Sequence, residues 1–148
     1  LQEDSGGAGQ RRGGSGTVWE VEPIGHEMTV VAFGEGRQIP TGGAAGAYNS
    51  MPDRKLGRLE QHHAGGKVTV HRKNTILSLK PGERARNVNP GGGGYGDPFH
   101  RDPRDVAADV RNGLVAREAA HAEYGVVVDA SGQADISATS AARVRDPR

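Results

Sequence analysis

The stretch "NPGGGGYGDPFHRDP" (89–103) sets four consecutive glycines between two prolines and then runs into a group of charged residues. Glycine backbone reaches conformations with positive φ and tolerates the close approach of another backbone. Three structures fit such a run: a phosphate-binding loop, a disordered linker and a shaped turn. The residues on either side of the run decide among them.

A nucleotide loop is the sharpest of the three readings, because Gly91, Gly93 and Gly96 satisfy the pattern G-x-G-x-x-G. A dinucleotide site also needs a strand directly before this pattern and a helix directly after it. Here Pro90 precedes the run, and residues 97–101 separate it from the next helical signals. No Gly-Lys-Ser/Thr follows, so the P-loop pattern fails as well. The flanks therefore favour a shaped turn.

Helical signals begin directly after the run. Asp102 is a good N-cap, Pro103 suits the first helical position, and Asn112-Gly113 supplies a stop. Between them, apolar residues recur every fourth position on one face, at Val106, Val110 and Leu114. A second short helix is predicted over about 117–124, ending at Gly125, although Ala116 offers no side-chain cap. These capping signals argue against a disordered linker.

Strand signals occupy the chain before the run. Short strands separated by Gly and Pro turns are predicted over 17–23, 27–36, 66–72, 75–83 and, weakly, 84–89. The first two are expected to form a hairpin. The small, turn-rich segment 40–57 is expected to be a functional or interface loop. The fold class predicted is α+β: a β-rich, sandwich-like domain with two short helices near the C-terminus.

The whole chain, 1–148, is predicted to be one domain. Its expected parts are a Gly-rich lead-in (1–16), a β-rich part (17–89), the Gly-rich turn with two helices and a strand (90–129), and a hairpin with a frayed or partner-bound tail (130–148). The hairpin should turn at Ser131-Gly132. The chain begins at Leu1, so we expect its true start to be trimmed or missing.

The composition predicts a thin core. Hydrophobic residues make up 34% of the chain, and 24 residues are glycine. Globular domains usually hold about 45–50% apolar residues, counting glycine. Partial disorder and a core completed by a partner chain both fit these numbers. We favour the partner chain, because the local strand and helix signals are well formed.

Charge and composition narrow the function classes. The net charge is +1, from 19 basic and 18 acidic residues that are interspersed, so no electrostatic footprint for nucleic acid is present. The Arg-Arg-Gly-Gly stretch at 11–14 is read as a glycine turn with two solvated arginines. No apolar run approaches the roughly 20 residues that span a bilayer, and no signal peptide is visible. We therefore expect no membrane partner and a cytoplasmic location.

No catalytic or metal-binding constellation is visible in the chain. Cysteine is absent, which excludes disulfides and thiolate chemistry, and the six histidines lack metal-ligand spacing. No serine lies in G-x-S-x-G. The densest group of acid, base and cation is Asp97, His100, Arg101 and Asp102. Asp97 is explained as a turn former and Asp102 as a cap.

Three stretches together resemble the carboxy-terminal part of the hydantoinase B/oxoprolinase family. They are "DSGGAGQRRGGSG" (4–16), "PGGGGYGDPFHRDPRDVAADVRNGLVAREAAHAEYGVVVD" (90–129) and "ASGQADISAT" (130–139). Members of this family are several times longer and work with a hydantoinase A-like partner that binds ATP. The resemblance therefore implies a subunit embedded among larger hydantoinase A-like and B-like chains, through an interface of about 2,000 Å² or more.

The resemblance also implies a range of activities. A free chain of about 15 kDa is most similar to the small subunit of ketone carboxylases such as acetophenone carboxylase. That similarity implies a mainly structural role in ATP-driven carboxylation of acetophenone with bicarbonate to benzoylacetate. ATP and a divalent metal would be bound mainly by other subunits, and none in this chain. The alternatives are a subunit of an ATP-dependent hydantoinase or oxoprolinase that opens cyclic amides, and a non-catalytic assembly or regulatory module.

The glycine run and its sequel supply the residues expected at the interface or lining a chamber. These are Gly91, Gly92, Gly93, Gly94, Tyr95, Asp97, His100 and Arg101.

Overall fold

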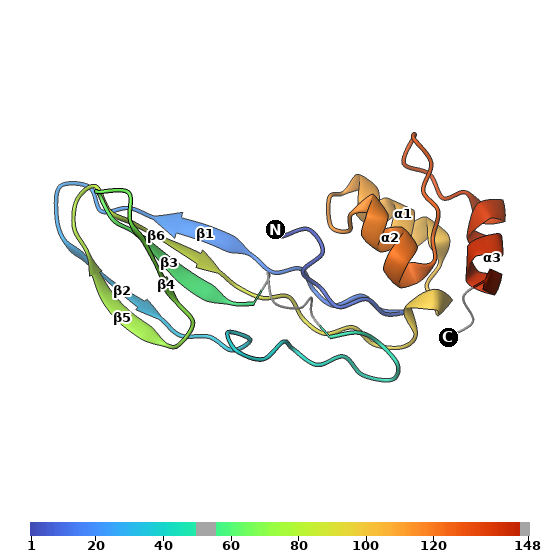
Figure 1. Ribbon diagram of the computed structural model, residues 1–148, viewed down its shortest axis with the longest axis horizontal. Helices are drawn as coiled ribbons and strands as arrows, with labels where there is room; N and C mark the ends of the chain where they lie inside the picture. The colour runs from blue at the N-terminus through green and yellow to red at the C-terminus, as the bar shows by residue number, and fades with distance from the viewer. Residues whose placement is uncertain (50–55, 146–148) are drawn as a thin grey trace.

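The computed structural model describes residues 1–49 and 56–145 and is elongated (Figure 1). All six strands lie at one end, in a part that we call the β lobe (17–39 and 56–89). The helices lie at the other end, in the helical lobe (98–145). Extended glycine-rich segments join the two lobes, and we call them the junction (4–16, 40–49 and 90–97). The predicted α+β class is confirmed.

Six short strands build the β lobe: β1 (Val18–Val21), β2 (Met28–Ala32), β3 (Arg58–His62), β4 (Val68–His71), β5 (Thr75–Leu79) and β6 (Arg84–Val88). All pairs are antiparallel, in a four-stranded sheet of order β1-β6-β3-β4 and a two-stranded sheet of β2 and β5. The five predicted strands are confirmed. The weakest of them, β6, is central and pairs with both β1 and β3.

Two expectations about the β lobe were wrong. β1 and β2 do not form a hairpin, because β1 pairs with β6 and β2 with β5, so the chain crosses from one sheet to the other between them. β3 (Arg58–His62) was also missed, because no strand was predicted between the irregular segment that ends at 57 and the strand that begins at 66. Its only apolar residue is Leu59, so alternation alone gave a weak signal. Residues 50–55 of the expected loop lie outside the described residues.

The two sheets enclose a small core. Leu59 of β3 and Leu79 of β5 are fully buried and face each other's sheet, together with Val30, Ala32 and Ala85. This arrangement is a small sandwich, as predicted. Because two of the five buried residues are alanines, the apolar area that stabilises the lobe is modest.

Four helical segments build the other lobe: the 3₁₀ turn η1 (Pro98–His100), α1 (Pro103–Arg111), α2 (Arg117–Tyr124) and α3 (Ile136–Arg145). The predicted start of α1 is confirmed, since the Asp102 carboxylate accepts from the Arg104 amide at 2.8 Å. α2 ends at Gly125, whose φ of 62° is the left-handed conformation that glycine favours. Ala116 gives α2 no side-chain cap, but its amide donates to Asp4 Oδ1 at 2.6 Å.

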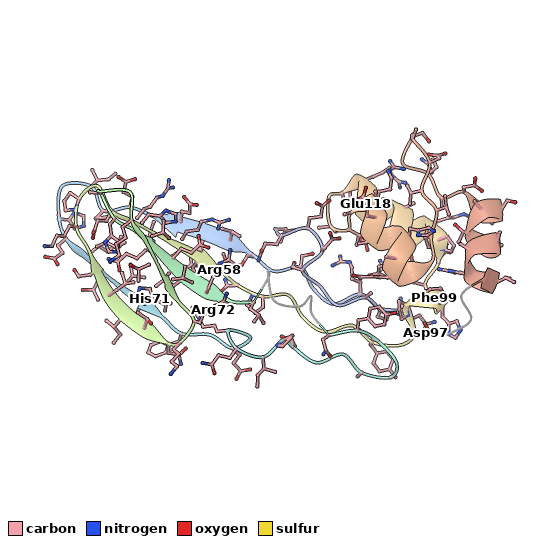
Figure 2. The ribbon with its side chains drawn as sticks, viewed as in Figure 1. Arg58, His71, Arg72, Asp97, Phe99 and Glu118 are labelled. Carbon is pink, nitrogen blue, oxygen red and sulfur yellow. The ribbon has the colours of Figure 1, made fainter. Side chains whose placement is uncertain are left out.

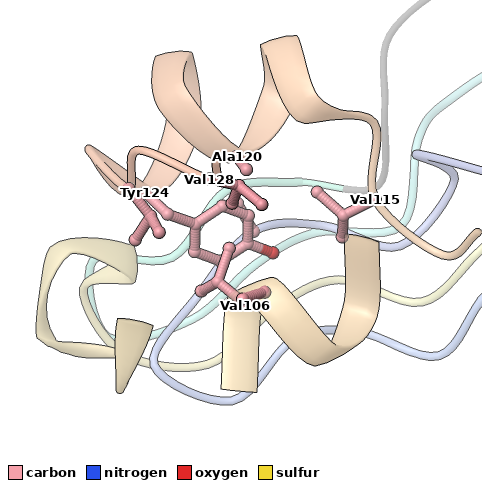
Figure 3. Packing of buried hydrophobic residues seen from close by; sticks show 8 residues of the cluster. Val106, Val115, Ala120, Tyr124 and Val128 are labelled. Atoms are coloured by element: carbon pink, nitrogen blue, oxygen red, sulfur yellow. The ribbon is translucent and has the colours of Figure 1, made fainter. Parts of the chain in front are cut away.

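Tyr124 lies at the centre of the helical core, surrounded by side chains from three segments of the chain (Figure 3). Val106 comes from α1, Ala120 from α2 and Val128 from the strand-like segment that follows α2. Ala8 of the junction is buried in the same cluster. This core is separate from the core of the β lobe, so each lobe packs around its own apolar residues.

The tail, expected to be frayed or partner-bound, is not frayed: it forms a third helix, α3. Residues 146–148 lie outside the described residues, and contact of the tail with a partner stays a prediction. Asp135 caps it by accepting from the Ala138 amide at 2.9 Å. Thr139 is buried and accepts from the Val127 amide at 3.0 Å, and Arg143 donates to the carbonyl oxygens of Tyr124 and Arg101. The contacts of Thr139 and Arg143 reach residues 12 or more positions away, so the local pattern of the segment did not reveal that the helix is held in place. None of the helices in the described part of the chain is long and apolar enough to cross a bilayer.

The hairpin predicted before α3 is confirmed. Val128 and Ala134 form an antiparallel bridge, and the Asp129 amide donates to Gln133 O at 2.8 Å. Gly132 has a φ of 82°, so it takes the conformation that the turn requires.

Candidate functional site

The glycine run lies in the junction, where three extended segments are joined by backbone hydrogen bonds. The Gly7 amide donates to Gly92 O at 2.8 Å, and the Gly92 amide donates to Gly14 O at 2.9 Å. On the other side of the run, the Ala44 amide donates to Gly94 O at 3.0 Å. The run is therefore the middle of three segments that come from distant parts of the sequence.

The glycines are needed here because the backbones of neighbouring segments approach one another too closely for a side chain, and not because of unusual dihedral angles. A Cβ atom added to Gly93 would lie 1.9 Å from Gly42 O, and one added to Gly91 would lie 2.1 Å from Ser5 O. At Gly13 the distance to Gly92 O would be 2.0 Å. Real Cβ atoms essentially never come within 3.0 Å of another heavy atom, so no other residue fits without moving the backbone. The surface against which the run packs belongs to this chain.

The residues expected at an interface fall into two groups. Gly91 and Gly94 are buried and Gly92 and Gly93 half-buried, all within the junction. Tyr95, 60% exposed, pairs its backbone with Arg11 and presents its ring at the surface. Contact with another subunit at these residues stays a prediction.

The charged residues after the run have local structural roles. Asp97 accepts from the Phe99 amide at 2.9 Å and caps η1, close to the base of the helical lobe (Figure 2). His100 is exposed. The structure thus confirms the turn and cap roles of Asp97 and Asp102.

One arginine of the lead-in is not solvated, contrary to expectation. Arg12 Nε donates to Asp109 Oδ2 of α1 at 2.9 Å, and Arg101 donates to the same oxygen at 2.6 Å. The Arg101 guanidinium also lies 5.8 Å from the centre of the Tyr124 ring. Burial raises the pKa of Tyr124 to about 12. Both arginines pair with the Asp109 carboxylate, and through Arg12 this cluster connects the junction to the helical lobe. Because the carboxylate is already paired, it is not available as a general base.

A second polar cluster has the layout of a nucleophilic triad. His63 Nδ1 lies 2.9 Å from Glu83 Oε1, and His63 Nε2 lies 2.9 Å from Thr69 Oγ1. A hydroxyl, an imidazole and a carboxylate in this order can activate a nucleophile. The neighbouring cavity of about 400 Å³ is lined by His63 but not by Thr69. A substrate in that cavity would not contact the Thr69 hydroxyl. The cluster therefore has a structural role: it holds the β3–β4 turn against the β5–β6 turn.

Hydrogen bonds hold the pKa of Glu83 below its ordinary value, first from the Lys80 amide and then from His63. On the outer face of the four-stranded sheet, Glu60 is likewise paired. Burial raises its pKa, but hydrogen bonds from Arg58 and Arg86 outweigh this effect and leave it lowered. Neither carboxylate is poised to act as a general base near neutral pH.

A cleft of about 680 Å³ lies between the segment after β2 (34–42) and the β4–β5 turn (72–74). Arg37 lines it and is only 5% exposed. Its Nη2 donates to Asn87 Oδ1 at 3.0 Å, whereas Nη1 is buried with no hydrogen-bond partner among the described residues. No sequence signal marked Arg37, because its surroundings come from segments far along the chain. Among the described residues, no group of His, Asp and Glu is arranged to hold a metal ion.

Comparison with known proteins settles the family. The model of the family described as hydantoinase B/oxoprolinase matches residues 1–98, which include the lead-in, the β lobe and the glycine run. The chain belongs to the hydantoinase B/oxoprolinase family. The resemblance seen in the sequence is thereby confirmed at the level of the family.

Two relatives and their structures refine this result. The chain is 59% identical over 143 residues to the caprolactamase subunit beta of Pseudomonas jessenii, covering 97% of this chain and 25% of the relative. It is 34% identical over 119 residues to the acetone carboxylase alpha subunit of Xanthobacter autotrophicus, covering 74% of this chain and 14% of the relative. The crystal structure of the ATP-dependent caprolactamase from P. jessenii superposes with a TM-score of 0.76 at 55% identity, over 97% of this chain and 25% of the other.

A nucleotide-free structure of acetone carboxylase superposes with a TM-score of 0.69 at 23% identity, over 98% of this chain and 24% of the other, and shows the shared fold alone. The chain spans a quarter or less of the length of these relatives. The expectation of an acetophenone carboxylase finds no support among them. The caprolactamase subunit is much more similar to this chain than the carboxylase subunit is.

Proposed function

We propose that this chain works within an ATP-dependent hydrolase of cyclic amides, as part of its hydantoinase B-type component. The observation that carries this proposal is the 59% identity to a caprolactamase subunit along 97% of the chain. The match spans both lobes and the junction, and this supports a shared fold and a shared place within such an enzyme.

The role that we propose for the chain is mainly architectural. The clusters around Asp109, His63 and Glu60 are internally paired, which suits side chains that hold a structure together. The outer face of β2 and β5 is apolar instead: Val31 and Ile76 lie opposite each other and are 53% and 67% exposed, and Phe33, just after β2, is 66% exposed. An exposed apolar patch of this kind is typical of a protein–protein contact. We propose that the larger hydantoinase B-like part covers it, while ATP and metal are bound elsewhere.

A carboxylase is the second candidate, and the acetone carboxylase relative is the observation that favours it. The two activities consume different co-substrates. A cyclic amide hydrolase opens a lactam with water and ATP, whereas a ketone carboxylase also consumes bicarbonate.

The test is a paired assay on the enzyme that copurifies with this chain. ADP release and formation of the ring-opened acid (an amino acid from caprolactam, an N-carbamoyl amino acid from a hydantoin) are measured, and ketone loss is measured with and without bicarbonate. We expect lactam- or hydantoin-dependent ADP release that does not need bicarbonate. Bicarbonate-dependent consumption of a ketone would refute the hydrolase and support the carboxylase, and isolation of the chain without any larger partner would refute the embedded role.

A further inference from the structure

The cleft beside Arg37 lies at the end of the β lobe that adjoins the junction. Its walls are the segment after β2, which runs on to Gly42 of the junction, and the β4–β5 turn. Figure 2 shows Arg72 of this turn at that end of the lobe. Among the lining residues are three cations, Arg37, Arg72 and Lys73, and one carboxylate, Glu35. The cleft is therefore basic in a chain whose net charge is only +1.

Arg37 is the residue of the cleft whose hydrogen-bonding capacity is left unsatisfied. A guanidinium carries five N–H donors, and burial without an acceptor of opposite charge is unfavourable. Here Nη2 of Arg37 donates to the neutral amide oxygen of Asn87, and Nη1 has no partner among the described residues. Burial lowers the pKa of Arg37, and no neighbouring carboxylate offsets this effect.

Gly34 opens one edge of this guanidinium to the cleft. A Cβ atom on Gly34 would lie 3.6 Å from Arg37 Nε and 3.9 Å from Nη2, and Gly34 itself lines the cleft. The Gly34 amide already donates to Asn74 Oδ1 at 3.2 Å, and the Gly57 amide to Gly36 O at 2.8 Å. The Gly34 amide, which lies at this edge, is therefore already used within the chain.

We propose that this cleft binds a carboxylate group, with the guanidinium of Arg37 as its anchor and Arg72 and Lys73 adding positive charge at the rim. The planar fork of a guanidinium matches the two oxygens of a carboxylate. The carboxylate comes either from a small molecule or from an Asp or Glu side chain of a partner chain. The inference goes beyond the proposed function, because it holds for either reaction.

The experiment uses the enzyme assembled with this chain and saturation-transfer NMR, which detects weak ligands on large complexes. The probe is hexanoate, which carries only a carboxylate charge, and hexanamide is its neutral match. Arg37→Gln removes the anchor. Gly34→Leu covers the Arg37 guanidinium but keeps Arg37 and its hydrogen bond to Asn87. This second variant still tests the site if Arg37→Gln fails to fold. Lys67→Gln, in the exposed β3–β4 turn away from the cleft, is the charge-matched control.

A small-molecule site predicts binding of the carboxylate probe over the amide. Arg37→Gln and Gly34→Leu should each weaken this binding by about tenfold or more, the value of one charge-assisted hydrogen bond, and Lys67→Gln by less than about twofold. A site filled by a partner's side chain predicts no probe signal, together with loss of partner chains on gel filtration for both cleft variants but not for the control. Equal binding of the two probes would overturn the inference. So would unchanged binding and unchanged partner retention in both cleft variants.

Discussion

Replacing Gly93 by alanine tests whether the junction is held together by backbone-to-backbone packing. The added Cβ would lie 1.9 Å from Gly42 O, so the two segments must separate by about 1 Å to reach an ordinary contact. The hydrogen bonds on either side would stretch with them, including the one from the Ala44 amide to Gly94 O at 3.0 Å.

Overpacking of this kind costs about 1–3 kcal/mol, and each hydrogen bond lost adds about 1 kcal/mol. With two bonds affected, we expect the junction to lose about 3–5 kcal/mol of local stability, a large share of the roughly 5–15 kcal/mol that stabilises a domain. Gly42→Ala is the matched control, since a Cβ at Gly42 meets nothing within 4 Å. It alters the facing residue of the same contact without a clash.

Amide hydrogen exchange followed by mass spectrometry measures this loss in the assembled enzyme, in peptides that cover residues 40–49 and 90–97, where the amides that join these two segments lie. A loss of 3–5 kcal/mol corresponds to exchange faster by about a hundred- to a few thousand-fold in Gly93→Ala, against no more than a few-fold in the control. Equal exchange in Gly93→Ala and Gly42→Ala, with equal yields, would show that the segments are not in the contact described, and the reasoning would fail.

Three further predictions concern other parts of the molecule. Ile76→Asp puts a charge on the exposed β2–β5 face and should release partner chains on gel filtration, whereas Ile24→Asp, in the β1–β2 connection, should not; full retention by both would exclude this face as the contact. Because burial raises the pKa of Tyr124 to about 12, the neutral phenol stabilises the fold below pH about 10, the ordinary tyrosine value, and as pH rises to about 12 up to about 3 kcal/mol should be lost. Phenolate absorbance should show a late step that Tyr124→Phe removes, and its absence from the wild type would contradict the buried position. The lowered pKa of Glu83 stabilises the fold above the ordinary glutamate range and loses this effect as pH falls through the lowered pKa, so the melting temperatures of wild type and Glu83→Gln should converge in acid; a constant difference would exclude the carboxylate as the cause.

Local signals in the sequence were enough to predict the helices after the glycine run and most of the strands. Asp102, Pro103 and Gly125 mark the ends of α1 and α2 through contacts with residues a few positions away, so a short window contains their cause. The α+β class follows from the same local patterns. The family could also be recognised, because the glycine run and its sequel are long and specific.

The partners of each segment were decided only by the tertiary structure. Arg12 meets Asp109, 97 positions away, and Gly93 fits against Gly42 because both segments lie in the junction. Nothing near Arg37 in the sequence indicates that Asn87 and a basic cleft surround it. A single sequence shows which residues can be buried or can allow another backbone to approach closely. It does not record which distant segment supplies the contact, because that choice depends on how both lobes pack at once.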